Sequence, residues 1–85
     1  MEITVKIFST FRKYLNTELA DKTEFNLSLS DLPGDKKTIS SLIEFLKLPS
    51  EQIGQMIING HIKWDKAIEL QPGDRIVLQP FIGGG

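Results

Sequence analysis

The chain has 85 residues, of which 40% are hydrophobic and 25% charged, and its formal net charge is −1. These values predict one small globular domain and argue against a nucleic-acid binder, which usually carries a basic surplus. No apolar run reaches transmembrane length and no secretory leader is visible, so we expect a cytoplasmic protein without a membrane partner.

The residue types that the sequence lacks exclude several kinds of active site. The sequence has no cysteine and a single histidine, His61. Disulfides, thiolate nucleophiles and cysteine metal sites are thereby excluded, and one histidine argues against histidine metal sites and Ser-His-Asp triads. We therefore expect a carrier or binding module that is not catalytic on its own and binds no metal or cofactor.

The first predicted element is a strand over residues 2–8. Ile3, Val5 and Ile7 alternate with polar residues, which is typical of a half-buried strand. Strict alternation places Phe8 on the polar face. Either Phe8 is exposed there, or the strand ends or twists and Phe8 packs inward.

A small apolar cluster and a second strand come next. The cluster is spaced for one or two helical turns against the sheet and consists of Phe11, Tyr14 and Leu15. Residues 23–29 alternate again, and the apolar face of this predicted strand carries Phe25, Leu27 and Leu29. Residues 30–37 contain a Pro-Gly-Asp signal and are predicted to form a loop.

One convincing helix follows the loop. Thr38 is a good N-cap, because its hydroxyl can accept a hydrogen bond from a backbone N–H of the first turn. The apolar residues that recur at helical spacing are Ile39, Leu42, Ile43 and Leu46. Pro49 disfavours helical geometry at Leu48, so we expect the helix to end there.

A hairpin is predicted in the second half of the chain. Residues 55–59 contain an apolar run that is too short for a helix and suits a central strand. Asn59-Gly60 then predicts a type I′ turn, since both residues tolerate positive φ, and residues 61–63 begin the return strand. In the irregular crossing over residues 64–70, the side chains expected to face the core are Ala67, Ile68 and Leu70.

The last predicted strand covers residues 75–79. Residues 71–74, Gln-Pro-Gly-Asp, suit a type II turn with proline at the second position and glycine supplying positive φ at the third. Within the strand, Ile76 and Leu78 are expected to face the core. The outward residues are expected to be Arg75, Val77 and Gln79.

The order of elements is strand, strand, helix, strand, short strand, strand. One helix on one face of a mixed sheet buries the helical stripe and the alternating strands together, so the fold class is α+β. With the first and last strands adjacent in the centre, this is the β-grasp, or ubiquitin-like, arrangement. We expect residues 1–82 to form the domain and residues 83–85 to form a flexible C-terminal glycine tail.

The glycine tail indicates where the function lies. Glycine has no Cβ, so a terminal run of it does not pack but fits a narrow cleft that excludes side chains. We therefore expect the carboxylate of Gly85 to be the functional group, with Gly83 and Gly84 carrying it into another protein's site.

A partner-binding surface is predicted beside this tail. If the first and last strands are neighbours, outward apolar side chains gather there, and such anchors are typical of partner-binding surfaces. The expected contact residues are Phe8, Val77, Pro80, Phe81 and Ile82. The alternative is that Phe8 and Phe81 cap the end of the core.

The segment from Leu70 to Ile76, followed by Pro80 and the glycine run, resembles the MoaD/ThiS family of ubiquitin-like sulfur carriers. The resemblance covers nearly the whole chain. The chain length and the Phe-x-x-Phe-Arg segment from Phe8 look closer to MoaD, the small subunit of molybdopterin synthase. Two features depart from the family: Phe81 follows Pro80 where the molybdopterin branch commonly has a second proline, and three glycines stand where two are usual.

The resemblance implies a mechanism and two partners. An E1-like adenylating enzyme of the MoeB/ThiF type would use ATP to adenylate the Gly85 carboxylate, and a sulfur donor would convert it to a thiocarboxylate. The thiocarboxylate would donate sulfur in the synthesis of molybdopterin for a molybdenum or tungsten cofactor, with the large synthase subunit (MoaE type) as second partner. The third glycine leaves Gly84 as the alternative working terminus.

Three other functions share parts of this pattern. A thiamine-branch sulfur carrier uses the same tail and activation. A ubiquitin-like modifier would instead be conjugated to lysines of target proteins through Gly85. A TGS-like regulatory binding module shares the β-grasp core and a similar Gly-Asp turn, but does not use a glycine tail.

Overall fold

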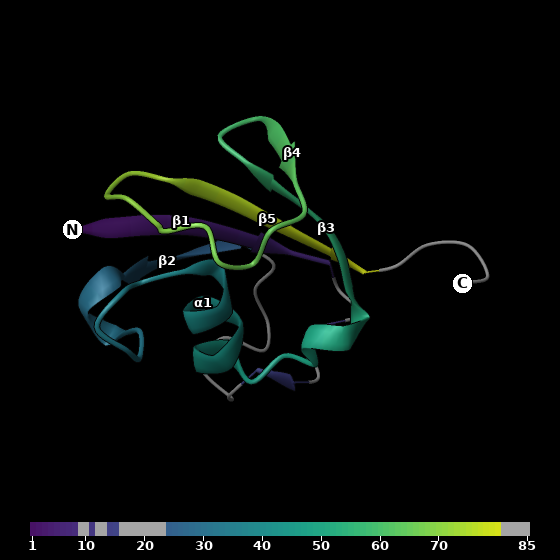
Figure 1. Cartoon of the computed structure of the whole chain (residues 1–85), viewed down its shortest axis with the longest axis horizontal. Helices are drawn as coiled ribbons and strands as arrows, with labels where there is room; N and C mark the ends of the chain where they lie inside the picture. The colour runs from purple at the N-terminus through teal and green to yellow at the C-terminus, as the bar shows by residue number, and fades with distance from the viewer. Residues whose placement is uncertain (9–10, 12–13, 16–23, 81–85) are drawn as a thin grey trace.

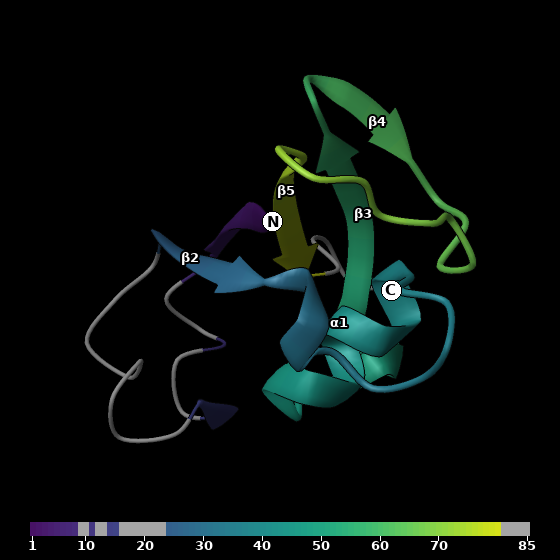
Figure 2. The same cartoon turned by 90° about the vertical axis from the view of Figure 1, so that its left-hand side faces the viewer.

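The computed structural model of the protein describes residues 1–8, 11, 14–15 and 24–80. A mixed sheet lies across one helix (Figures 1 and 2). The elements of these residues, in chain order, are β1 (Glu2–Ile7), β2 (Glu24–Ser28), η2 (Leu29–Asp31), α1 (Ile39–Leu46), η3 (Ser50–Gln52), β3 (Ile53–Ile58), β4 (His61–Lys63) and β5 (Arg75–Pro80). No helix among the described residues is long and apolar enough to cross a membrane.

The strands form one sheet in the order β2-β1-β5-β3-β4. The first and last strands pair in parallel at its centre, and the remaining neighbours are antiparallel. This is the expected β-grasp arrangement: a mixed sheet with its main helix on one face and the first strand beside the last.

Alternation in the strands builds the core. Ile3, Val5 and Ile7 are buried along β1, and the register sets Val5 between Phe25 of β2 and Ile76 of β5, both also buried. Residues directly opposite each other share a face of the sheet, so one face is apolar from β2 across to β3. The buried stripe of α1 that covers this face consists of Ile39, Leu42, Ile43 and Leu46.

The helix begins at the predicted cap. The Ser41 N–H donates to Oγ1 of Thr38, and the Thr38 N–H donates back to Oγ of Ser41, each over 3.2 Å. This reciprocal capping box satisfies two backbone donors at the start of α1. The helix ends at Lys47, which has a left-handed φ of 58°, two residues before Pro49.

Both predicted turns are confirmed. Asn59 and Gly60 have φ of 52° and 84°, as a type I′ hairpin turn requires, and Gly73 has φ of 87°. Asp74 then connects the two turns, because its Oδ1 accepts from Nδ2 of Asn59 at 2.9 Å and its Oδ2 accepts from the Gln71 N–H at 2.8 Å. We call this connection the Asn59–Asp74 clamp.

Several expectations are corrected. Leu29 is buried but belongs to η2 and not to the second strand, and β3 begins at Ile53, two residues earlier than predicted. Leu70 is buried and Ile68 half-buried as expected, but Ala67 is exposed. The Asp65 carboxylate accepts from the Ala67 N–H at 2.8 Å, and this local turn directs Ala67 away from the core.

The apolar cluster between the first two strands packs as predicted. Phe11 and Leu15 are buried in the core and Tyr14 is half-buried against it. This cluster extends the core past the end of β1.

Candidate functional site

The candidate site is the C-terminal end of β5, at Pro80, which we call the exit. β5 lies between β1 and β3, with Leu78 paired to Ile7 on one side and Pro80 paired to Ile53 on the other. Hydrogen bonding on both flanks fixes the direction in which the strand ends. The predicted contact residues Phe81 and Ile82 and the predicted tail at residues 83–85 lie outside the described residues.

An irregularity in β3 adjoins this exit. The pairing of β3 with β5 shifts register between Ile53 and Met56. Here the Gln55 Nε2 donates to the Gln79 Oε1 over 2.7 Å, one residue before Pro80. Such irregularities are common where a strand must be bent or a side chain re-aimed near a functional site. This side-chain hydrogen bond therefore links the last residues of β5 to the neighbouring strand β3.

The face of the sheet opposite α1 carries an apolar row. Val77 pairs with Ile57, and Ile57 pairs with Ile62 of β4, so all three side chains lie on the same face. Val77 and Ile57 are half-buried, while Ile62 is 55% exposed. We call these three residues the outer row. Val77 was predicted to face outward, whereas its two partners were not predicted to join it.

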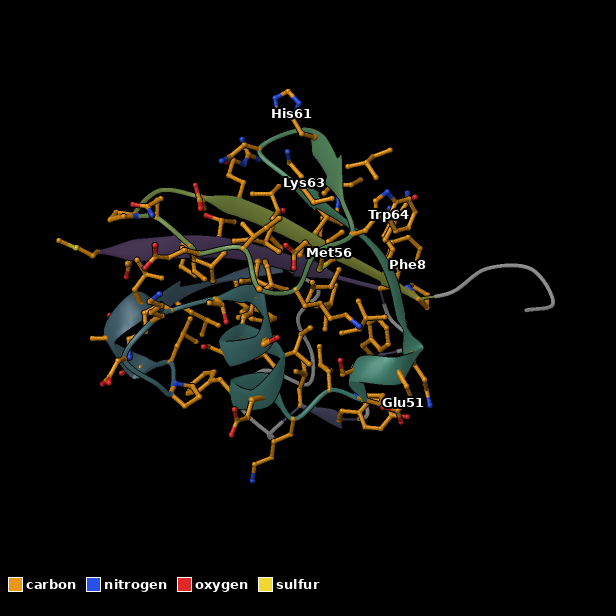
Figure 3. The ribbon with its side chains drawn as sticks, viewed as in Figure 1. Phe8, Glu51, Met56, His61, Lys63 and Trp64 are labelled. Carbon is orange, nitrogen blue, oxygen red and sulfur yellow. The ribbon has the colours of Figure 1, made fainter. Side chains whose placement is uncertain are left out.

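Two aromatic rings lie near the exit. Phe8 follows Ile7, the partner of Leu78, and is 40% exposed; Trp64, just after β4, is 67% exposed. Figure 3 shows both rings at the end of the sheet where β5 stops. The exposed alternative for Phe8 is therefore the observed one. Trp64 was missed as a surface anchor, because its exposure depends on how far β4 extends along β3.

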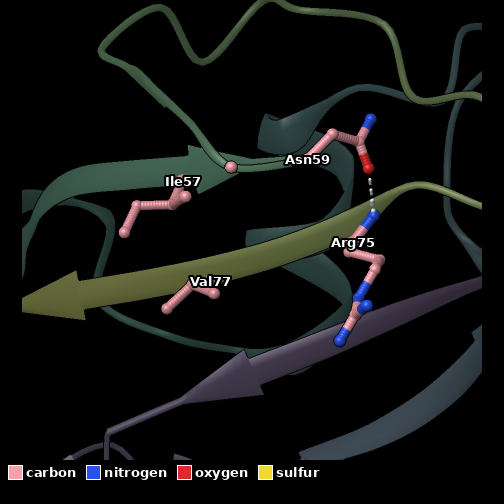
Figure 4. A pocket seen from close by; sticks show the side chains of 5 residues that line it. Ile57, Asn59, Arg75 and Val77 are labelled. Carbon is pink, nitrogen blue, oxygen red and sulfur yellow. Dashed lines mark hydrogen bonds between the residues drawn. The ribbon is translucent and has the colours of Figure 1, made fainter.

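The other end of the outer face is cationic. Arg75, which pairs with Thr4, lies at this end, and Lys6 lies on the same face beside its partner Val77. A shallow hollow beside Arg75, shown in Figure 4, is lined by Ile57, Asn59, Gly60, Arg75 and Val77. The outer face thus has an apolar middle, an aromatic end at the exit and a cationic end at the clamp.

The comparison with known proteins identifies the family. The sequence model of the ThiS family matches residues 13–85, which is most of the chain. The chain belongs to the ThiS family. No curated protein matches it significantly. ThiS-family proteins are ubiquitin-like sulfur carriers that generally work with an E1-like adenylating enzyme and a partner synthase.

The ThiS match accounts for much of the site but not all of it. It runs from β2 through β5 to the terminal glycines, and so includes the exit and the whole outer row. It leaves out β1, and with it Phe8. Among the described residues, no group of three or more histidine or carboxylate side chains is arranged to hold a metal ion.

Proposed function

We propose that this protein is a sulfur carrier that is activated at its C-terminal glycine for molybdopterin synthesis. In this reaction the Gly85 carboxylate attacks ATP, forming an acyl-adenylate and releasing pyrophosphate. A donor of sulfide-level sulfur then displaces AMP and leaves a thiocarboxylate. When the sulfur passes to the pterin precursor, water takes its place on the acyl carbon and regenerates the carboxylate. The observation that carries the proposal is the ThiS-family match, which runs through β5 to the glycine run.

The fold suits a co-substrate that supplies no catalytic group. A carboxylate is a poor electrophile, so adenylation provides the leaving group, and this chemistry takes place in the partner's active site. The strand that precedes the tail is bonded on both sides, so the body can present the tail in a fixed direction. Bare glycine backbone can enter a site that excludes water and side chains.

Docking is proposed to use the aromatic end and the outer row. Phe8 and Pro80 border the exit, Val77 belongs to the outer row, and Phe81 and Ile82 follow Pro80 in the sequence. These residues would bind the MoeB/ThiF-type adenylating enzyme first and the MoaE-type large synthase subunit afterwards. The assignment to the molybdopterin branch is supported by the Phe-x-x-Phe-Arg segment at Phe8–Arg12.

Intact-mass spectrometry tests the central step, which is the conversion of the C-terminal carboxylate to a thiocarboxylate. After incubation with an adenylating enzyme, ATP and a sulfur source, we expect a gain of about 16 mass units, as one carboxylate oxygen is replaced by sulfur. A chain without Gly84 and Gly85 should show no gain, and a chain without Gly85 alone decides which glycine is used. A gain that persists in the doubly truncated chain would contradict the proposal.

The molecule that accepts the sulfur distinguishes the molybdopterin branch from the thiamine branch. We expect the thiocarboxylated protein to form a dithiolene product with a MoaE-type subunit and a pterin precursor, and to transfer no sulfur to a thiazole synthase. The opposite result would place the chain in the thiamine branch. Isopeptide-linked conjugates in cells, without a thiocarboxylate, would indicate a protein modifier.

A further inference from the structure

The cationic end of the outer face has no role in the proposed chemistry. Arg75 opens β5, whereas Pro80 closes it, which separates them by roughly 16 Å at about 3.3 Å per residue. A tail held in a partner's active site does not itself cover this end, so a contact here rests on and extends the docking proposed for the outer row.

Two shallow hollows meet at Arg75. One extends toward the hairpin turn and is lined by Ile57, Asn59 and Gly60 together with Arg75 and Val77 (Figure 4). The other extends across β1 to β2, and its lining includes Thr4, Lys6 and Glu24 with the same two β5 residues. Aliphatic walls from Ile57 and Val77 thus stand beside two cations and a single carboxylate.

The backbone of Arg75 is hydrogen-bonded to Asn59, whereas its guanidinium has no partner among the described residues. Its N–H donates to the Asn59 Oδ1 and its carbonyl accepts from the Asn59 N–H, each over 2.9 Å. The nearest carboxylate in the sequence, Asp74, is already used by the clamp. Among the described residues, neither the Arg75 guanidinium nor the Lys6 ammonium has an ion-pair or hydrogen-bond partner.

We propose that this surface binds a partner protein segment in which a carboxylate side chain neighbours an aliphatic one. The carboxylate pairs with the Arg75 guanidinium, whose planar donors match its two oxygens, and Lys6 adds a second positive charge. The aliphatic side chain covers Val77 and Ile57. The charge on the surface determines this choice: Glu24 lies opposite Lys6, but Arg75 has no carboxylate opposite it, so the apolar strip beside Arg75 complements an acidic segment and repels a basic one. Arginine beside apolar contacts is also typical of interface hot spots.

A peptide titration tests the surface directly. The probes are an acetylated, amidated pentapeptide of alternating leucine and aspartate and its counterpart with asparagine, added to the full, ¹⁵N-labelled chain. We expect the backbone amides of Arg75, Val77 and Ile57 to shift, with half-saturation by the aspartate peptide at several-fold lower concentration. In Arg75→Gln this preference should disappear.

Lys63→Gln is the matched control, because Lys63 is an exposed cation on β4 and lines neither hollow. It should keep the preference for aspartate. Equal binding of the two peptides, no shifts with either, shifts located elsewhere, or an unchanged preference in Arg75→Gln would overturn the proposal. The titration contains neither ATP nor adenylating enzyme, so its outcome is independent of whether Gly85 is thiocarboxylated.

Discussion

Asn59 joins two turns that are far apart in the sequence. Its side chain donates to Asp74 and accepts from the Arg75 N–H, while its own backbone holds the left-handed φ of the hairpin turn. One residue therefore sets both the hairpin of β3 and β4 and the start of β5. The two roles can be separated experimentally, because glycine keeps the backbone conformation and removes the side chain.

Asn59→Gly should lower the free energy of unfolding by about 1 kcal/mol through loss of the clamp's hydrogen bonds, although the turn itself is preserved. Urea unfolding measures the change. Asp74→Ala removes the same connection from the other side. A double-mutant cycle should give a coupling energy above roughly 0.5 kcal/mol, and strictly additive losses would show that the clamp adds no stability.

The N-cap of α1 gives a second prediction at this scale. Thr38→Ala removes the hydroxyl that accepts from the Ser41 N–H, and should cost about 1 kcal/mol of stability. Thr38→Ser keeps that oxygen and should cost much less. Equal losses in the two variants, measured by chemical unfolding, would show that the cap contributes little.

At the scale of the elements, the sheet has one buried and one open face. α1 covers the first, where Leu42 and Met56 are fully buried, and no described element covers the second. The outer row is thus apolar surface that the fold itself does not bury. Substitutions on the two faces should consequently separate stability from partner binding.

Leu42→Ala should lower the free energy of unfolding by about 2–5 kcal/mol, because it leaves a cavity between α1 and the sheet. Urea unfolding measures this loss.

Ile62→Asp, on the exposed edge, should change the free energy of unfolding by less than about 0.5 kcal/mol. The same Ile62→Asp change should weaken binding to the adenylating enzyme by roughly tenfold, if that partner covers the outer row. Unaltered affinity in a titration would exclude Ile62 from the interface.

The sequence predicted the elements well where the signal is local. Alternation in β1, the Thr38 cap and the Asn59-Gly60 turn each depend on a few neighbouring residues, and each is confirmed. Ala67, the start of β3 and the exposure of Trp64 depend on hydrogen bonds or register between segments, which periodicity does not encode. The sequence also did not predict that the Arg75 guanidinium has no partner among the described residues. The neighbouring Asp74 carboxylate instead accepts a hydrogen bond from Asn59, which is distant in the sequence.

At the scale of the whole molecule, we propose separate roles for the body and the predicted tail. Residues 83–85 carry no side chain that a core can bury, so their removal should leave the free energy of unfolding unchanged within about 0.5 kcal/mol. Thermal unfolding of the chain with and without these residues measures this. A substantial loss would show that the glycines belong to the folded domain.

The central place of β5 has a consequence for biosynthesis. The ribosome makes β5 last among the strands, yet this strand separates β1 from β3, so the sheet cannot close while β5 is still inside the exit tunnel. A nascent chain that stalls before Arg75 lacks the strand that pairs with both β1 and β3, and we expect it not to reach this fold. We therefore expect folding to follow translation through Pro80, so that every body that folds already contains the strand leading to the predicted tail.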